Sequence, residues 1–429
     1  MKKYIIAVLI MGAILLISCD EPATDNSPEN PEVIRNFEVL GGDITPIMVN
    51  TLSTDESAVF VPAFADLAVD IFQRAFLENS EINNLVSPLS VLLALAMTAN
   101  GADSETLSEM EAVLGRGVDL AELNRLLSGF VNNLPSEDNA KLNIANSIWV
   151  RDCESFTANE DFLQVNRNYY ATQIMRAAFD SRTVDDINAW VSRNTDDMIP
   201  EIIQSIDPAA VMFLINAIVF DSEWDVPYEE NQISDHDFIT FDGRVQRTDF
   251  MWSTERYFIE TTNARGFLKP YAGGDYSFMA LLPNEGVAIT DFIAGMTGEG
   301  FINALNSAEQ HLEGVQVGLP KFTFEYEISM NRLLSEMGMP TAFSESGADF
   351  SRLGRSDLGN LFIHEVLHKT FIEVDEIGTR AAAVTSVEMR EESAPDYEFV
   401  ILDRSFVFAI VDNATNLPIF IGAVLEIPE

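Results

Sequence analysis

Five consecutive residues near the C-terminal end of the chain could form a metal site: His364-Glu365-Val366-Leu367-His368. They match the pattern H-E-x-x-H. On a helix, two histidines four residues apart lie on one face and can bind the same zinc ion, with the glutamate as general base. This chemistry would make the protein a zinc metalloprotease.

The residues on either side of this motif argue against a helix. Leu361–Ile363 and Phe371–Val374 are strand-like, being apolar and partly β-branched or aromatic. On a strand, residues four apart are separated by about 13 Å, a gap that zinc–nitrogen bonds of about 2 Å cannot bridge. We therefore keep the metalloprotease only as a remote alternative and expect neither a metal ion nor a cofactor.

The two cysteines, Cys19 and Cys153, could form at most one disulfide, so the chain is no disulfide scaffold. Cys153 could in principle serve as a catalytic nucleophile. It lies between Asp152 and Glu154, and acidic neighbours disfavour the reactive thiolate. We expect an unreactive free thiol there.

The N-terminal residues Met1–Ser18 have the form of a secretory signal peptide. Lys2 and Lys3 precede an apolar run from Tyr4 to Ile17, which is too short for a comfortable membrane span. The run ends in Leu-Ile-Ser-Cys, which resembles the lipobox of bacterial lipoproteins. This resemblance implies that Cys19 is acylated and becomes the first mature residue, because several acyl chains give stable anchoring. An ordinary signal peptide with an incidental cysteine is the alternative.

Residues 19–55 are expected to contain the lipidated cysteine and an acidic flexible tether. The stretch after Cys19 is rich in proline and acid and has almost no core-forming residue. The predicted protein is secreted across the inner membrane and lipid-anchored in the cell envelope. The sequence leaves open whether it faces the periplasm or the cell surface.

The overall charge excludes one large class of partners. The formal net charge is −43, and such a surface repels nucleic acid phosphates and anionic lipid. Only six of the 25 basic residues are lysines. Abundant acid with scarce lysine fits a salt-adapted protein, whose self-repulsion is screened in strong salt, and it fits equally a merely acidic extracytoplasmic protein.

From about Val59 onward the hydrophobic pattern is continuous, so we expect one α+β domain over residues 56–429. Ser87 and Pro88 should begin a helix, as its cap and first helical residue. The apolar run Val211–Phe220 predicts a buried strand. Other expected helices lie at about 64–76, 185–203 and 328–337, and extended segments at 142–150, 277–282, 315–319, 322–326, 361–374, 399–402, 406–411 and 418–424.

Four blocks, in this order, resemble the serpin family of protease inhibitors: Asn84–Ser90, Phe213–Phe220 with Trp224 shortly after, His368–Glu376, and Val400–Phe408. The resemblance implies helices packed around three β-sheets, with a large central sheet and an exposed reactive-centre loop. It also implies a region where the central sheet opens, and a buried histidine that hydrogen-bonds there. The residues that this region would contain are Ser87, Ser90, Asn216, Trp224 and His368.

The segment 379–390 alternates like a half-buried strand. One face is small or apolar throughout, whereas the other is mostly polar; the first face carries Thr379, Ala381, Ala383, Thr385, Val387 and Met389. The resemblance implies that this segment is exposed until a protease cuts the loop and then inserts into the central sheet. The implied hinge contains Glu376, Gly378, Thr379, Ala381, Ala382 and Ala383.

A serpin would act as a single-use suicide substrate of serine-type proteases, and of cysteine proteases as a further class. The protease supplies the nucleophile and forms an acyl-enzyme, so no residue of this chain needs a catalytic role. The implied partner is a covalently trapped protease, and the implied oligomeric state is a monomer. A non-inhibitory binding or chaperone role is the alternative; Arg380 and Val384 depart from the common inhibitory pattern.

The bond that the protease cuts is assigned by spacing. Counting from Glu376 at the family's usual spacing places it between Glu392 and Ser393. Counting back from Phe406 places it about two residues later, and we favour the first count because the sheet fixes the inserted length. Cleavage after Arg390 or after Met389 would shorten the inserted strand, and these two residues are the rivals.

Overall fold

The computed structural model describes residues 36–40, 47, 51–136, 140–357, 359–379 and 398–428. The expected signal peptide, Cys19, the hinge residues Ala381–Ala383 and the four candidate residues of the reactive bond lie outside these ranges. Among the described residues, no helix is long and apolar enough to cross a membrane.

The helices begin where the sequence supplies caps. In α1, Ser53 and Glu56 form a capping box, and in α2 Ser87 accepts a hydrogen bond from the Ser90 N–H while Pro88 occupies the first position, as predicted. The helices are α1 Thr54–Glu78, α2 Pro88–Ala99, α3 Ser104–Gly115, α4 Leu120–Val131, α5 Glu160–Tyr170, α6 Ser181–Asn194, α7 Ile289–Ala294, α8 Gly298–Asn306 and α9 Asn331–Met337, with 3₁₀ turns η1 Glu230–Gln232 and η2 Pro340–Phe343.

Two predicted helices are shorter than expected. The helix expected to reach residue 203 ends at Asn194, because Asp196 and Asp197 adopt left-handed backbone conformations with φ of 46° and 62°. Residues 328 and 329, expected to be helical, belong to a strand instead.

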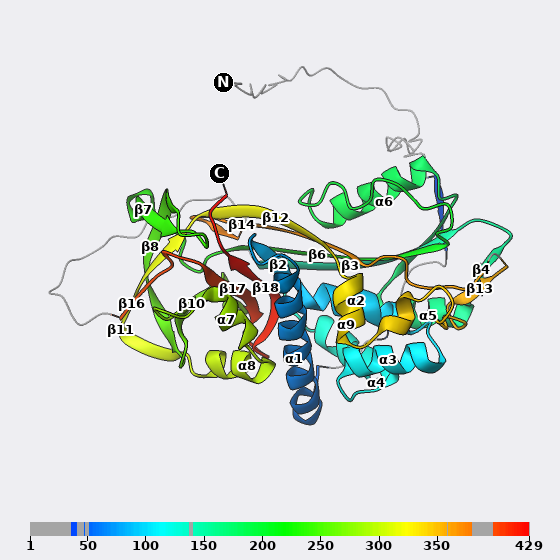
Figure 1. Cartoon of the computed structure of the whole chain (residues 1–429), viewed down its shortest axis with the longest axis horizontal. Coiled ribbons are helices and arrows are strands. Elements are labelled where there is room, and N and C mark those ends of the chain that lie inside the picture. Colours follow the sequence, from blue (N-terminus) through cyan, green and yellow to red (C-terminus); the bar gives the residue numbers. More distant parts are fainter. Residues whose placement is uncertain are drawn as a thin grey trace, which may run out of the picture. The chain divides into compact units, whose positions relative to one another are not determined.

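Within the described ranges, the sheet that contains the candidate site has five strands in the order β1-β5-β3-β6-β15. Their bounds are β1 Phe37–Val39, β5 Gln173–Ala177, β3 Ala140–Arg151, β6 Met212–Glu223 and β15 Gly378–Thr379. Helix α6 covers one face, where Ile187 and Trp190 join a core cluster with Trp149 of β3. The other face belongs to the main core, to which α2 contributes most of its residues, and Figure 1 shows these two helices on opposite sides of β3 and β6.

The flexible tether predicted over residues 19–55 is too long, because some of these residues belong to regular structure. Within residues 19–55, strand β1 pairs with β5, Glu38 opposite Arg176, and the N–H of Ile47 donates to the carbonyl of Asn168. Helix α1 then begins at Thr54. Part of the segment predicted to be flexible therefore belongs to the sheet, because Phe37 packs edge-on against Trp149 with ring centroids 5.1 Å apart and so has apolar surface to bury.

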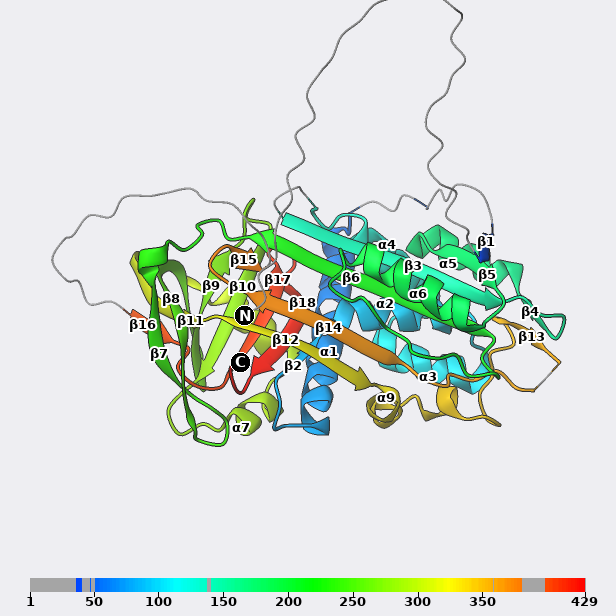
Figure 2. The ribbon, with the colours of Figure 1, turned by 90° about the horizontal axis from the view of Figure 1, so that it is seen from above.

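A second pair of strands, β12 Phe322–Ser329 and β14 Leu367–Val374, continues the first sheet across a gap. In the described part of the chain, no hydrogen-bonded ladder joins β14 to β6. The two strands nevertheless run side by side (Figure 2), and residues of both line the same narrow cavity. The large central sheet is thus divided into two parts.

Among the residues that the structure describes, nine of the remaining strands form one continuous sheet. Strand β8 joins its two parts, because β7 pairs with Val245–Met251, β11 with Phe250–Phe258 and β9 with Tyr257–Glu260. The second and third sheets expected from the sequence are thus linked. Its strands are β16 Glu398–Ile401, β11 Glu309–Pro320, β8 Val245–Glu260, β9 Ala264–Pro270, β10 Tyr276–Pro283, β17 Phe406–Asp412, β18 Leu417–Val424, β2 Asn84–Val86 and β7 Ile233–Ile239; β4 Phe156–Ala158 and β13 Gly354–Ser356 pair separately.

Candidate functional site

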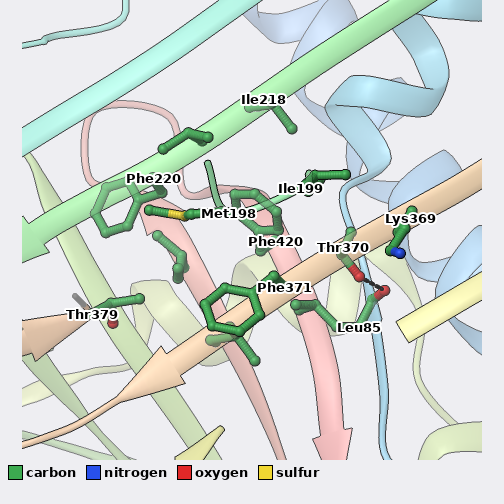
Figure 3. A pocket seen from close by; sticks show the side chains of 13 residues that line it. Leu85, Met198, Ile199, Ile218, Phe220, Lys369, Thr370, Phe371, Thr379 and Phe420 are labelled. Atoms are coloured by element: carbon green, nitrogen blue, oxygen red, sulfur yellow. Dashed lines mark hydrogen bonds between the residues drawn. The ribbon is translucent and has the colours of Figure 1, made fainter. Parts of the chain in front are cut away.

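The gap between β6 and β14 is the first feature of the site. Ile218 and Phe220 face it from β6, Thr370 and Phe371 from β14, and Met198 from the segment after α6 (Figure 3). The free volume left among these side chains is about 20 Å³, which is little more than one water molecule needs. An additional strand could enter only if the strands separate and the overlying side chains move away.

A tight turn at one end of this gap reverses the chain. The carboxylate of Asp375 accepts hydrogen bonds from the N–H groups of Ile377 and Gly378, at 2.8 and 3.1 Å. The Asp375 N–H in turn donates to the Gly378 carbonyl at 3.1 Å. These bonds close a turn that connects β14 to β15.

The returning strand β15 is already paired with β6. Gly378 lies opposite Glu223 and Thr379 opposite Ser222, in antiparallel register. Beside them, the N–H of Trp224 donates to the carbonyl of Ile377 at 2.8 Å. The first residues of the predicted hinge therefore occupy the top of the gap as a short inserted strand.

The side chain of Thr379 is buried, with 4% of its surface exposed. Its hydroxyl lies 2.6 Å from the hydroxyl of Tyr271, within hydrogen-bond distance. Burial raises the pKa of Tyr271 far above its usual range, so this phenol stays protonated and neutral. The sequence placed Thr379 in an exposed loop that buries it only after cleavage; the structure instead buries it beforehand.

Tyr271 is part of an aromatic platform beneath the hinge. Its ring stacks on Trp224 with centroids 4.7 Å apart and an interplanar angle of 12°, and the Trp224 indole N–H donates to the Asp375 carbonyl at 2.9 Å. On the same platform, Lys269 is 2.8 Å from Glu255 in a buried ion pair and lies 4.3 Å from the ring centroid of Tyr228. The hinge thus packs on buried side chains whose polar groups form hydrogen bonds or ion pairs.

Gly378 is required by close packing at this point. A Cβ atom at this residue would lie 2.1 Å from the carbonyl oxygen of Ser222, far inside van der Waals contact. The family resemblance assigned Gly378 to the hinge, and the structure shows that the paired hinge has no room for a side chain there.

An ion pair holds the turn from the other side. Lys321 lies 2.5 Å from Glu376 and lowers the pKa of that carboxyl group. Sequence reasoning named Glu376 but missed Lys321 and Tyr271. The scarcity of lysine was the one signal that could have pointed to Lys321. In a chain with so few lysines and so many acidic residues, each lysine is a candidate for an ion pair.

The residues expected to mark the opening of the sheet lie close to the gap. His368 is buried, and its Nε2 accepts a hydrogen bond from the Ser87 N–H at 3.0 Å. Ser87 also accepts from the Ser90 N–H. Burial lowers the pKa of His368 to about 4, so the ring is a neutral acceptor at ordinary pH, which confirms the expected buried, hydrogen-bonded histidine.

The side chain of Asn216 forms its hydrogen bond with Asn146, and not with His368. Its amide nitrogen donates to Oδ1 of Asn146 at 2.8 Å, across the β3–β6 ladder. Its own Oδ1 is buried and has no hydrogen-bond partner among the residues that the structure describes. This acceptor therefore lies unused on the strand that borders the gap.

The H-E-x-x-H motif is not helical. His364 lies in an irregular segment, and β14 begins at Leu367, so His364 and His368 do not share a helical face. The backbone carbonyl of His364 accepts from Asn331, and the His368 ring is engaged by Ser87. The geometry that the zinc hypothesis requires is absent from this segment.

Comparisons with known proteins agree on one family. The family model "Serpin (serine protease inhibitor)" matches residues 62–427. Human neuroserpin is 28% identical over 379 residues, which cover 85% of this chain and 91% of neuroserpin. The crystal structure of the thermophilic serpin tengpin in its native state superposes with a TM-score of 0.84 at 46% identity, covering 90% of this chain and 97% of tengpin. Tengpin in its latent state gives a TM-score of 0.79 at 44% identity, covering 89% and 100%.

Proposed function

Because the chain belongs to the serpin family, we propose that it inhibits serine-type proteases as a single-use suicide substrate. Serpins are in general protease inhibitors rather than enzymes. The protease attacks a bond in the loop after Thr379 and forms an acyl-enzyme. The freed loop segment then extends β15 into the gap between β6 and β14, and the displaced protease loses the geometry that deacylation needs.

The observation that carries the proposal is the register of β15 on β6. Continuing it by steps of two places Ala381, Ala383, Thr385, Val387 and Met389 opposite Phe220, Ile218, Asn216, Leu214 and Met212, respectively. The small or apolar side chains of the loop would thus lie on the same face of the sheet as the β6 side chains that already point into the main core. This match of alternation and register supports insertion.

The same register supports a site for the inserted Thr385. It would lie directly opposite Asn216, whose Oδ1 has no partner among the described residues. A threonine hydroxyl can donate to that oxygen. Insertion would therefore give a partner to a buried acceptor, which costs about 1–3 kcal/mol while it is unpaired.

The length of β6 limits where cleavage is productive. The register reaches the first residue of β6, Met212, at Met389. A cut after Glu392 leaves all of this segment free to insert, and a cut after Arg390 still does. A cut after Met389 would place the acylated residue at the very end of the strand, so the register disfavours Met389 and is compatible with cleavage after either Glu392 or Arg390. We keep the bond Glu392–Ser393 as the proposal because of its spacing from Glu376.

The test is incubation with a panel of proteases, followed by denaturing gels. We expect a covalent complex that survives heat and SDS with at least one serine protease. Cleavage without any such complex would overturn the proposal and indicate a substrate or a non-inhibitory role. In the complex, mass spectrometry of the released C-terminal fragment should find Ser393 as its first residue; Glu391 would instead assign Arg390.

We also propose that the protein acts at the cell envelope, anchored through Cys19 and working as a monomer. The apolar run that ends in Ser-Cys supports this location. Replacement Cys19→Ala should move the protein from the membrane fraction to the soluble fraction. Equal membrane association of both forms would contradict the anchor.

A further inference from the structure

We infer that the hinge of the loop is docked in the central sheet before any protease cuts, and that the Tyr271 hydroxyl is the positioning group that holds it there. This inference rests on the proposed function for its consequence, but not for its geometry. The docked unit consists of Gly378 and Thr379, paired with Glu223 and Ser222.

Thr379 provides the one side chain of β15, since Gly378 has none. That side chain is buried and its hydroxyl is 2.6 Å from the Tyr271 hydroxyl. Tyr271 itself is fully buried and fixed by stacking on Trp224 and by edge contact with Phe220. The Tyr271 hydroxyl is therefore a buried hydrogen-bond partner, held in a fixed position beside the Thr379 hydroxyl.

Two backbone hydrogen bonds of the hinge report on docking. The Trp224 N–H donates to the Ile377 carbonyl, and the Tyr228 N–H donates to the Glu376 carbonyl, each at 2.8 Å. Both donors belong to the segment that follows β6, not to the loop. If the hinge leaves the sheet, these two amides lose their acceptors and become exchangeable with solvent.

Docking has a consequence for inhibition. A strand that grows from a preformed, paired start needs no separate nucleation step, because the chain reversal and the first pairing are already in place. Insertion competes with deacylation, so a docked hinge favours trapping over release of the cleaved loop. Weakening the Tyr271–Thr379 contact should therefore divert part of the reaction into ordinary substrate cleavage.

The experiment is hydrogen exchange, measured by mass spectrometry on peptides that contain Trp224 and Tyr228, in the intact full-length protein. In Tyr271→Phe the Thr379 hydroxyl is left unpaired, and in Thr379→Val the Tyr271 hydroxyl is left unpaired. Each single variant should lower the protection of these amides about tenfold, the effect expected for one buried hydroxyl without a partner. The double variant should recover to within about threefold of the wild type, because neither polar group then remains.

The matched control is Tyr276→Phe. Tyr276 is equally buried, also contacts Phe220, and donates its hydroxyl to the Pro135 carbonyl at 2.7 Å, away from the hinge. Protection at Trp224 and Tyr228 should stay unchanged in this variant. Unchanged protection in both single variants, or an equal loss in Tyr276→Phe, would overturn the assignment of Tyr271.

The second readout is the number of inhibitor molecules consumed per protease molecule trapped. It should rise in both single variants and return toward the wild-type value in the double variant; no change in the single variants would overturn the proposed role in nucleation. If the wild type traps no protease at all, the proposed function fails, while the exchange data still decide whether Tyr271 docks the hinge.

Discussion

The buried histidine beside the gap should make the stability of the protein depend on pH in a predictable direction. The ring of His368 accepts a hydrogen bond from the Ser87 N–H, and a protonated ring cannot accept it. Burial lowers the pKa of His368 to about 4, whereas the unfolded chain protonates near pH 6.5. Acid therefore favours the unfolded chain, so stability is complete above about pH 6.5 and falls until about pH 4.

The size of the effect follows from the two pKa values. With about 6.5 in the unfolded chain and about 4 in the folded protein, the contribution lost between pH 8 and pH 5 is about 2 kcal/mol. It approaches about 3 kcal/mol near pH 4. This single group would account for a considerable part of a stability that in proteins is typically about 5–15 kcal/mol.

The assay is the urea midpoint of unfolding at several pH values between 8 and 5, for the wild type and for His368→Gln. Glutamine can accept the same hydrogen bond and does not titrate. Between pH 8 and pH 5, the variant should therefore lose about 2 kcal/mol less of its free energy of unfolding than the wild type loses. His311→Gln, at a site on β11 away from the gap, is the control and should follow the wild type. Parallel curves for the wild type and His368→Gln would refute the reasoning.

Three further outcomes are expected. Cleavage in the loop should raise the melting temperature by at least about 10 °C, since each kcal/mol of new sheet contacts is worth about 2 °C in a large domain; equal melting of cut and intact protein would exclude insertion. Thr379→Arg places an unpaired charge in a buried site, which costs several kcal/mol, so gels should show cleavage with little covalent complex, and an unchanged yield of complex would argue against a buried Thr379. The melting temperature should rise with NaCl into the molar range, because screening relieves the repulsion behind the net charge of −43; a flat or falling curve would leave simple surface acidity.

Local sequence signals predicted the elements around the site well. Ser87 and Pro88 start α2 because a cap and a first-turn proline need only their own neighbours. The apolar run Val211–Phe220 and the expected extended segment 406–411 correspond to strands β6 and β17. The helix α6 was extended too far because its apolar spacing continues through Met198, while two left-handed aspartates end it earlier.

The contacts that make the hinge a docked strand were not predictable in the same way. Tyr271 and Thr379 are 108 residues apart in the sequence. Lys321 and Glu376 meet only because Lys321 precedes β12, Glu376 follows β14, and these two strands are paired. The family resemblance located the hinge, but it described the loop as exposed until cleavage. Only the pairing of Gly378 and Thr379 with β6, together with the contact of Thr379 with Tyr271, reveals that the first residues of the loop are already in the sheet.

A docked hinge raises the question of why the rest of the loop does not follow it into the gap without cleavage. The answer lies in the other end of the loop, where β16 begins at Glu398 and pairs with β11. In Figure 2, β16 lies beyond β15. Because β15 pairs with the Glu223 end of β6, the Met212 end of β6 lies at the opposite end of the gap. Inserting the chain from Thr379 to Met389 carries it about 33 Å away from the hinge. The nine steps from Met389 to Glu398 can span at most about 32 Å, which is too short to return past the hinge to β16. Full insertion therefore requires either a cut in the loop or the detachment of β16 from β11, so as long as β16 stays paired only a cut in the loop allows full insertion.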